Sequence, residues 1–380
     1  MSRMGERRGG RARRLAGLMR KEALQVLRDP SSIGIAFLLP LLLLFLFGYG
    51  VSLDARGVPI ALVVEQPGPA AASFTGSFRE SPWFAPRVMP DRASAEAALL
   101  GREVQAFVVL RSGFERALGR AHGAPIQLVV NGVDANTARL IEGYVRGAWE
   151  RWLENEARAA GQELVRPVQL EQWIWFNPEV NSRYFLVPGL IAIVMTLIGA
   201  LLTAVVVARE WERGTMEALL STPVTAGEIL IAKVVPYFVL GLGGLALSVA
   251  MAVWLFHVPL VGSFWVLLVT SSLFLLAALG MGLLISTVSR SQFAASQIAI
   301  LATFLPAFIL SGFIFDIGSM PAPVRGITHL IAARYFVAIL HTVFLAGDVW
   351  SVIVPNALAL AAMAALFLGL TRRLTRTRLE

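Results

Sequence analysis

Cysteine is absent from this sequence of 380 residues, which excludes disulfides, thiolate nucleophiles and cysteine-based metal sites. Lysine is almost absent. Lys21 and Lys233 are the only two, and neither follows the glycine-rich stretch of a phosphate-binding loop. The chain therefore supplies no Walker-type nucleotide site of its own.

Recognisable catalytic patterns are missing too. The four histidines are scattered without the spacing of metal ligands, and neither Gly-x-Ser-x-Gly nor His-Glu-x-x-His occurs. Acidic residues are nearly missing from the long apolar segments, which leaves a proton relay little to work with. We therefore expect neither an enzyme nor a bound cofactor or metal.

Charged residues are scarce, at 15% of the chain, whereas hydrophobic residues make up 56% and the mean hydropathy is +0.68. Soluble proteins carry roughly a quarter charged residues. Apolar runs longer than about 18 residues recur, which is the length that crosses roughly 30 Å of hydrocarbon. The sequence predicts an α-helical membrane protein with six transmembrane helices. They are expected at residues 33–53, 184–208, 234–256, 264–288, 293–310 and 349–370.

One long segment breaks this pattern. Residues 54–183 carry polar and charged groups throughout, with no run long enough to span a membrane. Short β-type runs alternate there with helical stretches, which predicts an inserted α/β domain of about 130 residues, a normal domain size. The expected strands are 58–64, 106–110 and 126–130, and the expected helices are 91–100, 113–119 and 134–160.

The net charge of +8 is unevenly distributed. Arginine and lysine concentrate before the first span, in residues 209–233 and in the tail, 371–380, while the short connections on the other side hold only Arg325 and Arg334. Because basic residues mark the cytoplasmic side, we expect both termini inside and the α/β domain to be extracytoplasmic. Residues 1–32 read as an amphipathic helix at the membrane interface, so lipid is favoured over nucleic acid as a partner.

The cytoplasmic connection between the second and third spans, residues 209–233, is longer than a turn requires and carries its own helix signals. Thr215 is a predicted N-cap with Glu217 in the first turn, and Thr225 with Glu228 forms a predicted capping box. We expect a short helical element against the membrane surface. In that interpretation it presents Glu210, Glu212 and Glu217, and a plain solvated loop is the alternative.

A second unusual stretch, residues 311–348, precedes the last span. Its first residues are apolar but turn-prone, and prolines follow at positions 321 and 323. This pattern predicts a re-entrant or interfacial hairpin, which is allowed where protein covers its backbone. The following residues, 324–345, are expected to form a helix at the outer surface.

These stretches together resemble ABC-2 type transporter permeases, of the subgroup with a large extracytoplasmic domain between the first two transmembrane helices. The match runs nearly end to end and is weakest in residues 66–125. Its most specific part is Glu210-Trp211-Glu212-Arg213-Gly214-Thr215-Met216-Glu217, followed by Leu220-Ser221-Thr222-Pro223 and Lys233, which resembles the family's coupling segment. Lys21-Glu22 with Leu27-Arg28-Asp29 resembles the interface helix.

The resemblance implies the permease subunit of an ATP-binding-cassette exporter in the bacterial inner membrane. Two permeases, identical or sister chains, would assemble with two cytoplasmic ATPase subunits. The residues implied to dock the ATPase are Glu210, Glu212, Arg213, Gly214, Thr215, Glu217, Thr222, Pro223 and Glu228. Those implied to form the outer hairpin are Ser311, Gly312, Phe313, Phe315, Arg334 and Tyr335.

The expected cargo is an amphipathic, drug-like small molecule moved outward, since the spans are predominantly apolar. A lipid or glycan cargo remains an alternative. For the extracytoplasmic domain three roles stay open: gating the exit, receiving a partner in the cell envelope, or binding substrate. A membrane-anchored sensor is the alternative from another class, although its tail after Leu370 has only ten residues.

Overall fold

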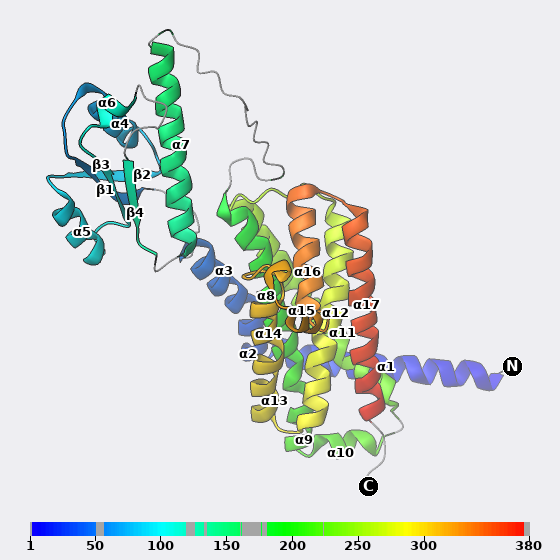
Figure 1. Ribbon diagram of the computed structural model, residues 1–380. Helices are drawn as coiled ribbons and strands as arrows, with labels where there is room; N and C mark the ends of the chain where they lie inside the picture. The colour runs from blue at the N-terminus through cyan, green and yellow to red at the C-terminus, as the bar shows by residue number, and fades with distance from the viewer. Residues whose placement is uncertain are drawn as a thin grey trace. The chain divides into compact units, whose positions relative to one another are not determined.

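A computed structural model describes residues 2–50, 57–118, 126–132, 135–159, 161, 176, 181–222 and 224–375 (Figure 1). The chain forms two compact units. Met1–Val51 and Ile174–Glu380 make up the helical unit, and Ser52–Trp173 makes up the α/β unit. The predicted fold class, a helical membrane protein with an inserted α/β domain, is confirmed.

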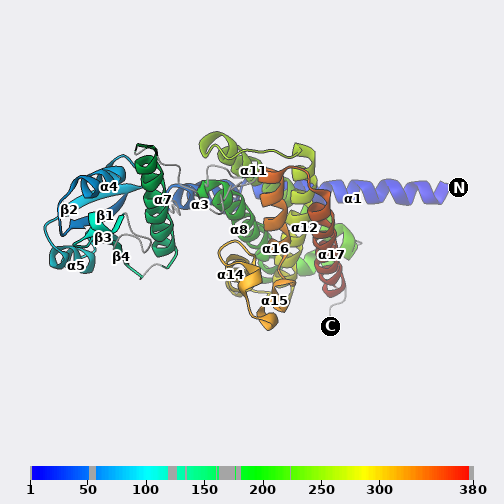
Figure 2. The same cartoon turned by 45° about the horizontal axis from the view of Figure 1, so that its top comes forward.

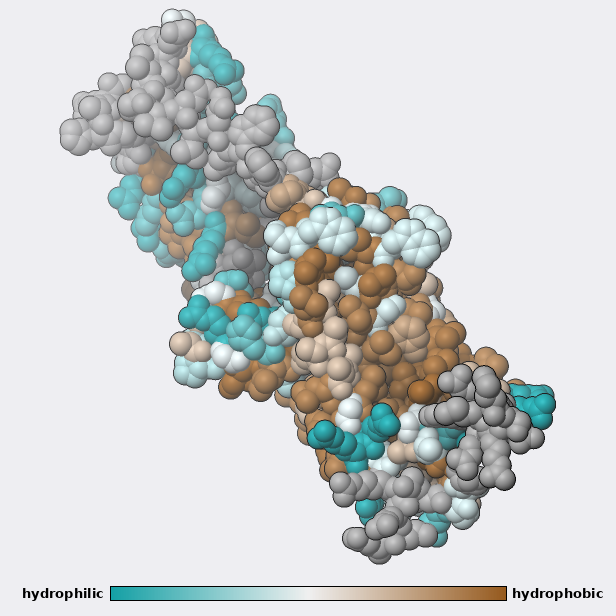
Figure 3. Space-filling view, turned by 90° about the vertical axis from the view of Figure 1, so that its right-hand side faces the viewer, coloured by the Kyte–Doolittle hydropathy of each residue, from teal (hydrophilic) through white to brown (hydrophobic). Residues whose placement is uncertain are grey.

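The helical unit contains six helices that, among the described residues, are long and apolar enough to cross a membrane. They are Pro30–Gly50, Ser182–Glu212, Ala226–Leu255, Phe264–Ser289, Gln292–Leu310 and Trp350–Leu374. Each of the six predicted spans overlaps one of these helices, with ends that differ by up to eight residues. Hydrophobic residues cover most of the face of this unit seen in Figure 3, as expected for a surface in contact with lipid.

Most of these spans are built from more than one helical piece. The first comprises α2 (Pro30–Ile33), the π-helical η1 (Gly34–Leu38) and α3 (Leu39–Gly50). The fifth comprises α13 (Gln292–Ala299), the π-helical η3 (Ile300–Phe304) and α14 (Leu305–Leu310). Pro40 and Pro306 lie just after η1 and η3. Proline has no backbone N–H to donate within a helix, and the change from α-helical to π-helical hydrogen bonding beside it accommodates that loss. The other pieces are α8 (Ser182–Ala204), α9 (Val206–Glu212), α11 (Ala226–Ala250), η2 (Met251–Leu255), α12 (Phe264–Ser289) and α17 (Trp350–Leu374).

The N-terminal helix α1 (Ser2–Leu27) runs across the bundle and not along it, as Figures 1 and 2 both show. Its C-terminal half packs against α11, and Val26 is buried. A helix with basic residues on one side and apolar residues on the other suits the membrane interface.

The segment before the last span differs from its prediction. Instead of one surface helix over 324–345, the chain forms α15 (Ala322–Thr328), α16 (Ala332–His341) and the π-helical η5 (Thr342–Ala346), after the short 3-10 turn η4 (Ile317–Ser319). The two helical pieces meet at an angle of 83°. Most of the apolar side of α16 is buried, and Phe336 stacks on Phe274 of α12 with ring centroids 4.1 Å apart. Burial of this apolar side explains why α16 packs into the bundle.

The α/β unit is built on a four-stranded sheet in the order β2-β1-β3-β4, with β4 antiparallel to β3 and the other pairs parallel. Three strands match their predictions: β1 (Val58–Val64), β3 (Ala106–Leu110) and β4 (Ile126–Val130). The strand β2 (Phe84–Met89) and the helix α4 (Pro69–Arg79) were not predicted. Helices α4, α6 (Phe114–Leu118) and α7 (Ala135–Ala159) cover one face around an aromatic core, and α5 (Arg92–Leu100) covers the other.

Candidate functional site

The second span is interrupted where it reaches the connection to the third. Helix α8 ends at Ala204, and α9 begins at Val206, after the single residue Val205. The backbone N–H groups of Val207 and Ala208 donate to Oγ of Ser286 on α12, at 3.0 and 2.9 Å. The first N–H groups of a helix have no partner within it, so one buried hydroxyl accepts both and fixes α9 against α12.

We expect Ser286→Ala to destabilise the helical unit, because it leaves two buried N–H groups without their acceptor. A buried N–H group without a hydrogen-bond acceptor lowers the free energy of unfolding by about 1–3 kcal/mol. Thr287→Ala is the matched control, since that hydroxyl donates back to the Leu283 carbonyl in its own helix. Thermal unfolding of both purified variants checks this prediction. Equal melting temperatures for the two would contradict the capping role of Ser286.

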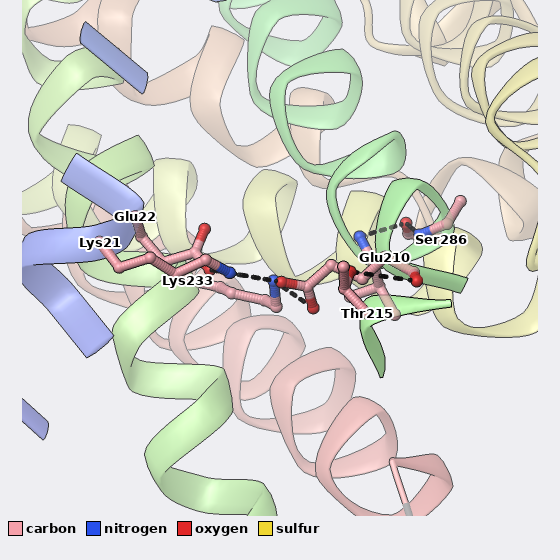
Figure 4. A network of polar contacts seen from close by, with 8 residues as sticks. Lys21, Glu22, Glu210, Thr215, Lys233 and Ser286 are labelled. Atoms are coloured by element: carbon pink, nitrogen blue, oxygen red, sulfur yellow. Dashed lines mark hydrogen bonds and ion pairs between the residues drawn. The ribbon is translucent and has the colours of Figure 1, made fainter. Parts of the chain in front are cut away.

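Directly after this break lies a cluster of four charged side chains, which we call the charge cluster (Figure 4). Glu210 of α9 binds Nζ of Lys21 at 2.8 Å and Nζ of Lys233 at 2.9 Å. Glu22 binds the same two ammonium groups, at 3.1 and 3.4 Å. The cluster thus joins α1, which carries Lys21 and Glu22, to α9 and to α11, which carries Lys233.

The charge cluster is electrically balanced and largely buried. Glu22, Glu210 and Lys233 are 3%, 5% and 2% exposed. Two acids and two bases sum to zero, which is the condition under which buried ions are tolerated. Burial acts to lower the pKa of Lys21, but the bonds and charges of Glu210 and Glu22 outweigh it and raise that pKa. Lys21 therefore stays protonated.

Both lysines of the chain lie in this cluster. A lysine ammonium is a compact charge with three donors on a flexible stem, so it can bridge two carboxylates, whereas a guanidinium favours one planar partner. In the sequence the two lysines exclude a nucleotide site and belong to the stretches that resemble the interface helix and the coupling segment, but they do not predict this pairing. The rarity of lysine is the one sequence signal for the charge cluster. Lys21 and Lys233 lie far apart in the sequence, as do Glu22 and Glu210, so the sequence does not show that they meet.

The structure corrects the prediction that Glu210 is presented on an exposed face. Its carboxylate points into the protein toward Lys21 and Lys233 (Figure 4), so no partner can reach it without opening the cluster. Glu228 is also buried, at 2% exposure, where it forms the predicted capping box with Thr225 and pairs with Arg14 at 3.6 Å. A charged sequence pattern alone does not reveal such partners.

A second set of contacts fixes α9 to its other neighbours. Arg209 pairs with Asp29 at 3.2 Å and donates to Oε1 of Gln292 at 3.2 Å. Burial alone would raise the pKa of Asp29, but bonds from Ser31, Ser32 and Arg209 lower it to about 2. The Glu212 carboxylate accepts the backbone N–H of Gln292 at 2.7 Å and also its side-chain amide. The start of α13 is thereby tied to the end of α9.

The short helix α10 (Thr215–Leu220) follows α9 and is the exposed part of the connection. Its N-cap is Gly214 in a left-handed conformation, φ 68°, and not Thr215 as predicted. Glycine adopts this conformation without the strain of a Cβ atom. The Thr215 hydroxyl donates instead to the Glu210 carbonyl at 3.3 Å.

The remaining predicted docking residues fall into a clear pattern. Arg213, Gly214, Thr215, Glu217 and Thr222 are exposed, and Glu212 is exposed while bonded to Gln292. Pro223 lies outside the described residues. The exposed surface around α10 is thus continuous in sequence with the buried charge cluster.

The predicted outer-hairpin residues do not join this site. They lie elsewhere in the helical unit, where Phe313 packs against Gly189 in the first half of α8 so closely that a Cβ there would lie 2.1 Å from its ring. Ser311 and Phe313 are buried, Gly312 has a φ of 86° and Phe315 is exposed. Arg334 and Tyr335 are partly buried in the first turn of α16. Among the described residues, no group of three or more acidic or histidine side chains could hold a metal ion.

Comparison with known proteins places these features in a family. Residues 31–373 match the family described as "ABC-2 family transporter protein". The chain is 46% identical to "Probable multidrug ABC transporter permease YbhS" of Escherichia coli (strain K12), over 97% of this chain and 98% of that protein. It is 28% identical to "Probable multidrug ABC transporter permease YbhR" of the same organism, over 93% and 98%. It is also 27% identical to "Inner membrane transport permease YhhJ", over 81% and 82%.

Proposed function

Since this chain belongs to the ABC-2 family of transporter permeases, we propose that it moves an amphipathic, drug-like molecule outward with energy from a separate ATPase subunit. The family and its six candidate spans fit a multi-pass protein of the inner membrane. The names of YbhS and YbhR support a drug-like cargo, because both are called multidrug permeases. Lipid and glycan cargo are the other outcomes of a transport assay.

The observation that carries this proposal is the contrast between α10 and the charge cluster. Helix α10 offers exposed polar residues to a partner, whereas Glu210, five residues before it, is locked to α1 and α11. A push on α10 is therefore transmitted through α9 to α1 and α11 together. Discrete rigid-body movement of this kind is how packed cores respond to a local force.

The proposed assembly contains two permease chains and two ATPase subunits. Escherichia coli has more than one permease similar to this chain, among them YbhS at 46% and YbhR at 28% identity, which supports pairing with a sister chain as well as with a copy. The arginine and lysine distribution supports a cytoplasmic position for both termini and for α10. The α/β unit would then face the envelope, where it gates the exit, receives a partner or binds substrate.

The docking role of α10 is tested by Glu217→Lys. We expect it to lower the permease-dependent stimulation of ATP hydrolysis about tenfold, because a misplaced charge at an interface weakens association. Glu217 is preferred to Glu212, since reversal at Glu212 also removes the acceptor of the Gln292 N–H. The measurement is ATPase activity of the reconstituted complex.

Glu103→Lys is the matched control, an equal charge reversal at an exposed residue of the α/β unit. It should leave stimulation unchanged. Full stimulation by the Glu217→Lys complex, with normal folding of the permease, would count against docking through α10.

A further inference from the structure

The sheet of the α/β unit has two edge strands in the described part of the chain, and they differ in how well they are protected. At one edge, β2 contains Pro86 and Arg87, residue types that discourage a further strand from pairing. At the other edge, β4 contains neither a proline nor a charged residue between Ile126 and Val130. An unprotected edge offers its backbone groups to another strand. The backbone of β4 is therefore a candidate interaction surface.

The hydrogen bonds beside β4 show which of its backbone groups face outward. Asn131, directly after β4, donates its N–H to the Gln105 carbonyl at 2.8 Å. Residues of an antiparallel pair alternate between bonded and non-bonded positions, so Val129 also faces β3. The N–H and C=O groups of Leu128 then point away from β3, as do those two residues before and after it. Among the described residues, these outward groups form no hydrogen bond.

An apolar groove lies on the α7 side of this edge (Figure 1). Its volume is about 280 Å³, and it is lined by Ile126 and Leu128 of β4 and by Phe74, Val145 and Trp149 of α4 and α7. Two charged residues of α7 also line it, but they pair with each other at 2.8 Å and so do not require a charged ligand. An added strand would place every second side chain on this face of the sheet. The groove thus suits the apolar side chains of such a strand.

We propose that β4 of one chain pairs antiparallel with β4 of a second copy, so that two four-stranded sheets become one continuous sheet. The strand is complementary to itself about Leu128. In that register apolar residues oppose apolar residues, and Gln127 opposes Val129 of the partner. Like charges directly opposite each other destabilise a pair of strands, and none arise here. The apolar side chains on the groove side of each β4 then extend the groove of the other copy.

The protected edge at β2 limits this assembly to two chains. A self-complementary contact about a two-fold axis closes on itself, whereas two open edges on each chain would permit a fibre. The arrangement deepens the proposed assembly, on which it rests for the presence of two permease chains, by assigning a contact and an identical partner. The contact itself follows from the α/β unit alone.

The absence of cysteine makes this contact directly measurable, since one introduced cysteine has no background. In the proposed pair, Leu128 lies opposite the partner's Leu128 at a hydrogen-bonded position, where Cα atoms are about 5.5 Å apart and a disulfide can form. We expect oxidation of full-length Leu128→Cys in proteoliposomes to give a covalent dimer about tenfold faster than that of Val88→Cys, because the partner thiol is held nearby. Val88 of β2 is 58% exposed, so random collision favours the control.

A change in the backbone of β4 separates strand pairing from mere proximity. Val130→Pro, added to Leu128→Cys, removes an outward N–H and leaves the bonds to β3 in place, as proline at a sheet edge does. It should abolish the cross-link. Val130→Thr is the matched control, because it retains the N–H and the β-branched shape, and should leave the cross-link unchanged. Equal melting temperatures show that the variants are folded.

Two results would overturn the proposal: a Leu128→Cys cross-link no faster than that of Val88→Cys, or a cross-link that persists in folded Val130→Pro. Pairing of β4 with a strand of a different protein gives the first result, since no covalent dimer of this chain then forms. Oxidation needs no ATPase subunit, so failure of docking through α10 would not affect it. Normal ATPase stimulation without the cross-link would overturn the β4 contact and leave the proposed function intact.

Discussion

Replacing Lys233 with methionine is expected to lower the free energy of unfolding by about 3–5 kcal/mol, the cost of leaving a buried charge without its partner. Lys233 is 2% exposed and bridges Glu210 at 2.9 Å and Glu22 at 3.4 Å. Methionine fills a similar volume, so the loss reflects charge and not a cavity. The variant carries a net buried charge of −1, since two carboxylates then share Lys21 alone.

A second substitution distinguishes charge balance from shape. Adding Glu22→Gln to Lys233→Met restores neutrality, because Lys21 and Glu210 remain as one pair, and much of the lost stability should return. Lys21→Met is expected to cost less, since the Lys21 side chain is 47% exposed, so its ion pairs with Glu210 and Glu22 are the more solvated ones of the cluster and contribute less. Denaturant titration of the purified variants gives the three values. If Lys233→Met and Lys21→Met were equally mild, the charge cluster would not stabilise the fold.

The predicted parts of the fold were those with a local signal. The strands β1, β3 and β4 are short apolar runs rich in β-branched residues, and such runs are identifiable without any partner. The strand β2 was missed because Pro86 and Arg87 interrupt its pattern, which is tolerated at the edge of a sheet. The bend between α15 and α16 was missed because apolar composition predicts the length of a helical segment but not the point at which the segment changes direction.

The candidate site shows the same limit more sharply. The capping box of Thr225 and Glu228 spans four residues and was predicted correctly. The pairing of Glu210 with Lys21 spans 189 residues and was not, so an acid in a charged segment was taken to be exposed. Gly214 and Thr215 are adjacent, and either can start a helix, so only the backbone geometry identifies Gly214 as the N-cap.

Substitution of Gly282 is the second change for which we expect a large effect, because this glycine lies where α12 packs closely against α8. A Cβ atom there would lie 2.3 Å from the Ala200 carbonyl oxygen and 2.3 Å from the Thr203 hydroxyl. Backbone cannot move aside as a flexible side chain can. The same contact includes a bond from the Thr203 hydroxyl to the Leu279 carbonyl at 2.9 Å, so separating the helices also breaks a buried hydrogen bond.

Three Gly→Ala variants should therefore form a graded series in thermal stability. Gly369→Ala, with nothing within 4 Å of the new Cβ, should be neutral or stabilising, since alanine favours a helix by about 1 kcal/mol. Gly280→Ala meets only the side chains of Phe367 and Leu368 at 3.2 Å, and a small change is expected. Gly282→Ala should lose about 1–3 kcal/mol or more through overpacking. Because Ser286 of α12 also holds α9, Gly282→Ala should weaken transmission of movement from α10 to the bundle and so lower ATPase stimulation. Unchanged stability and unchanged ATPase stimulation would show that α8 and α12 separate freely.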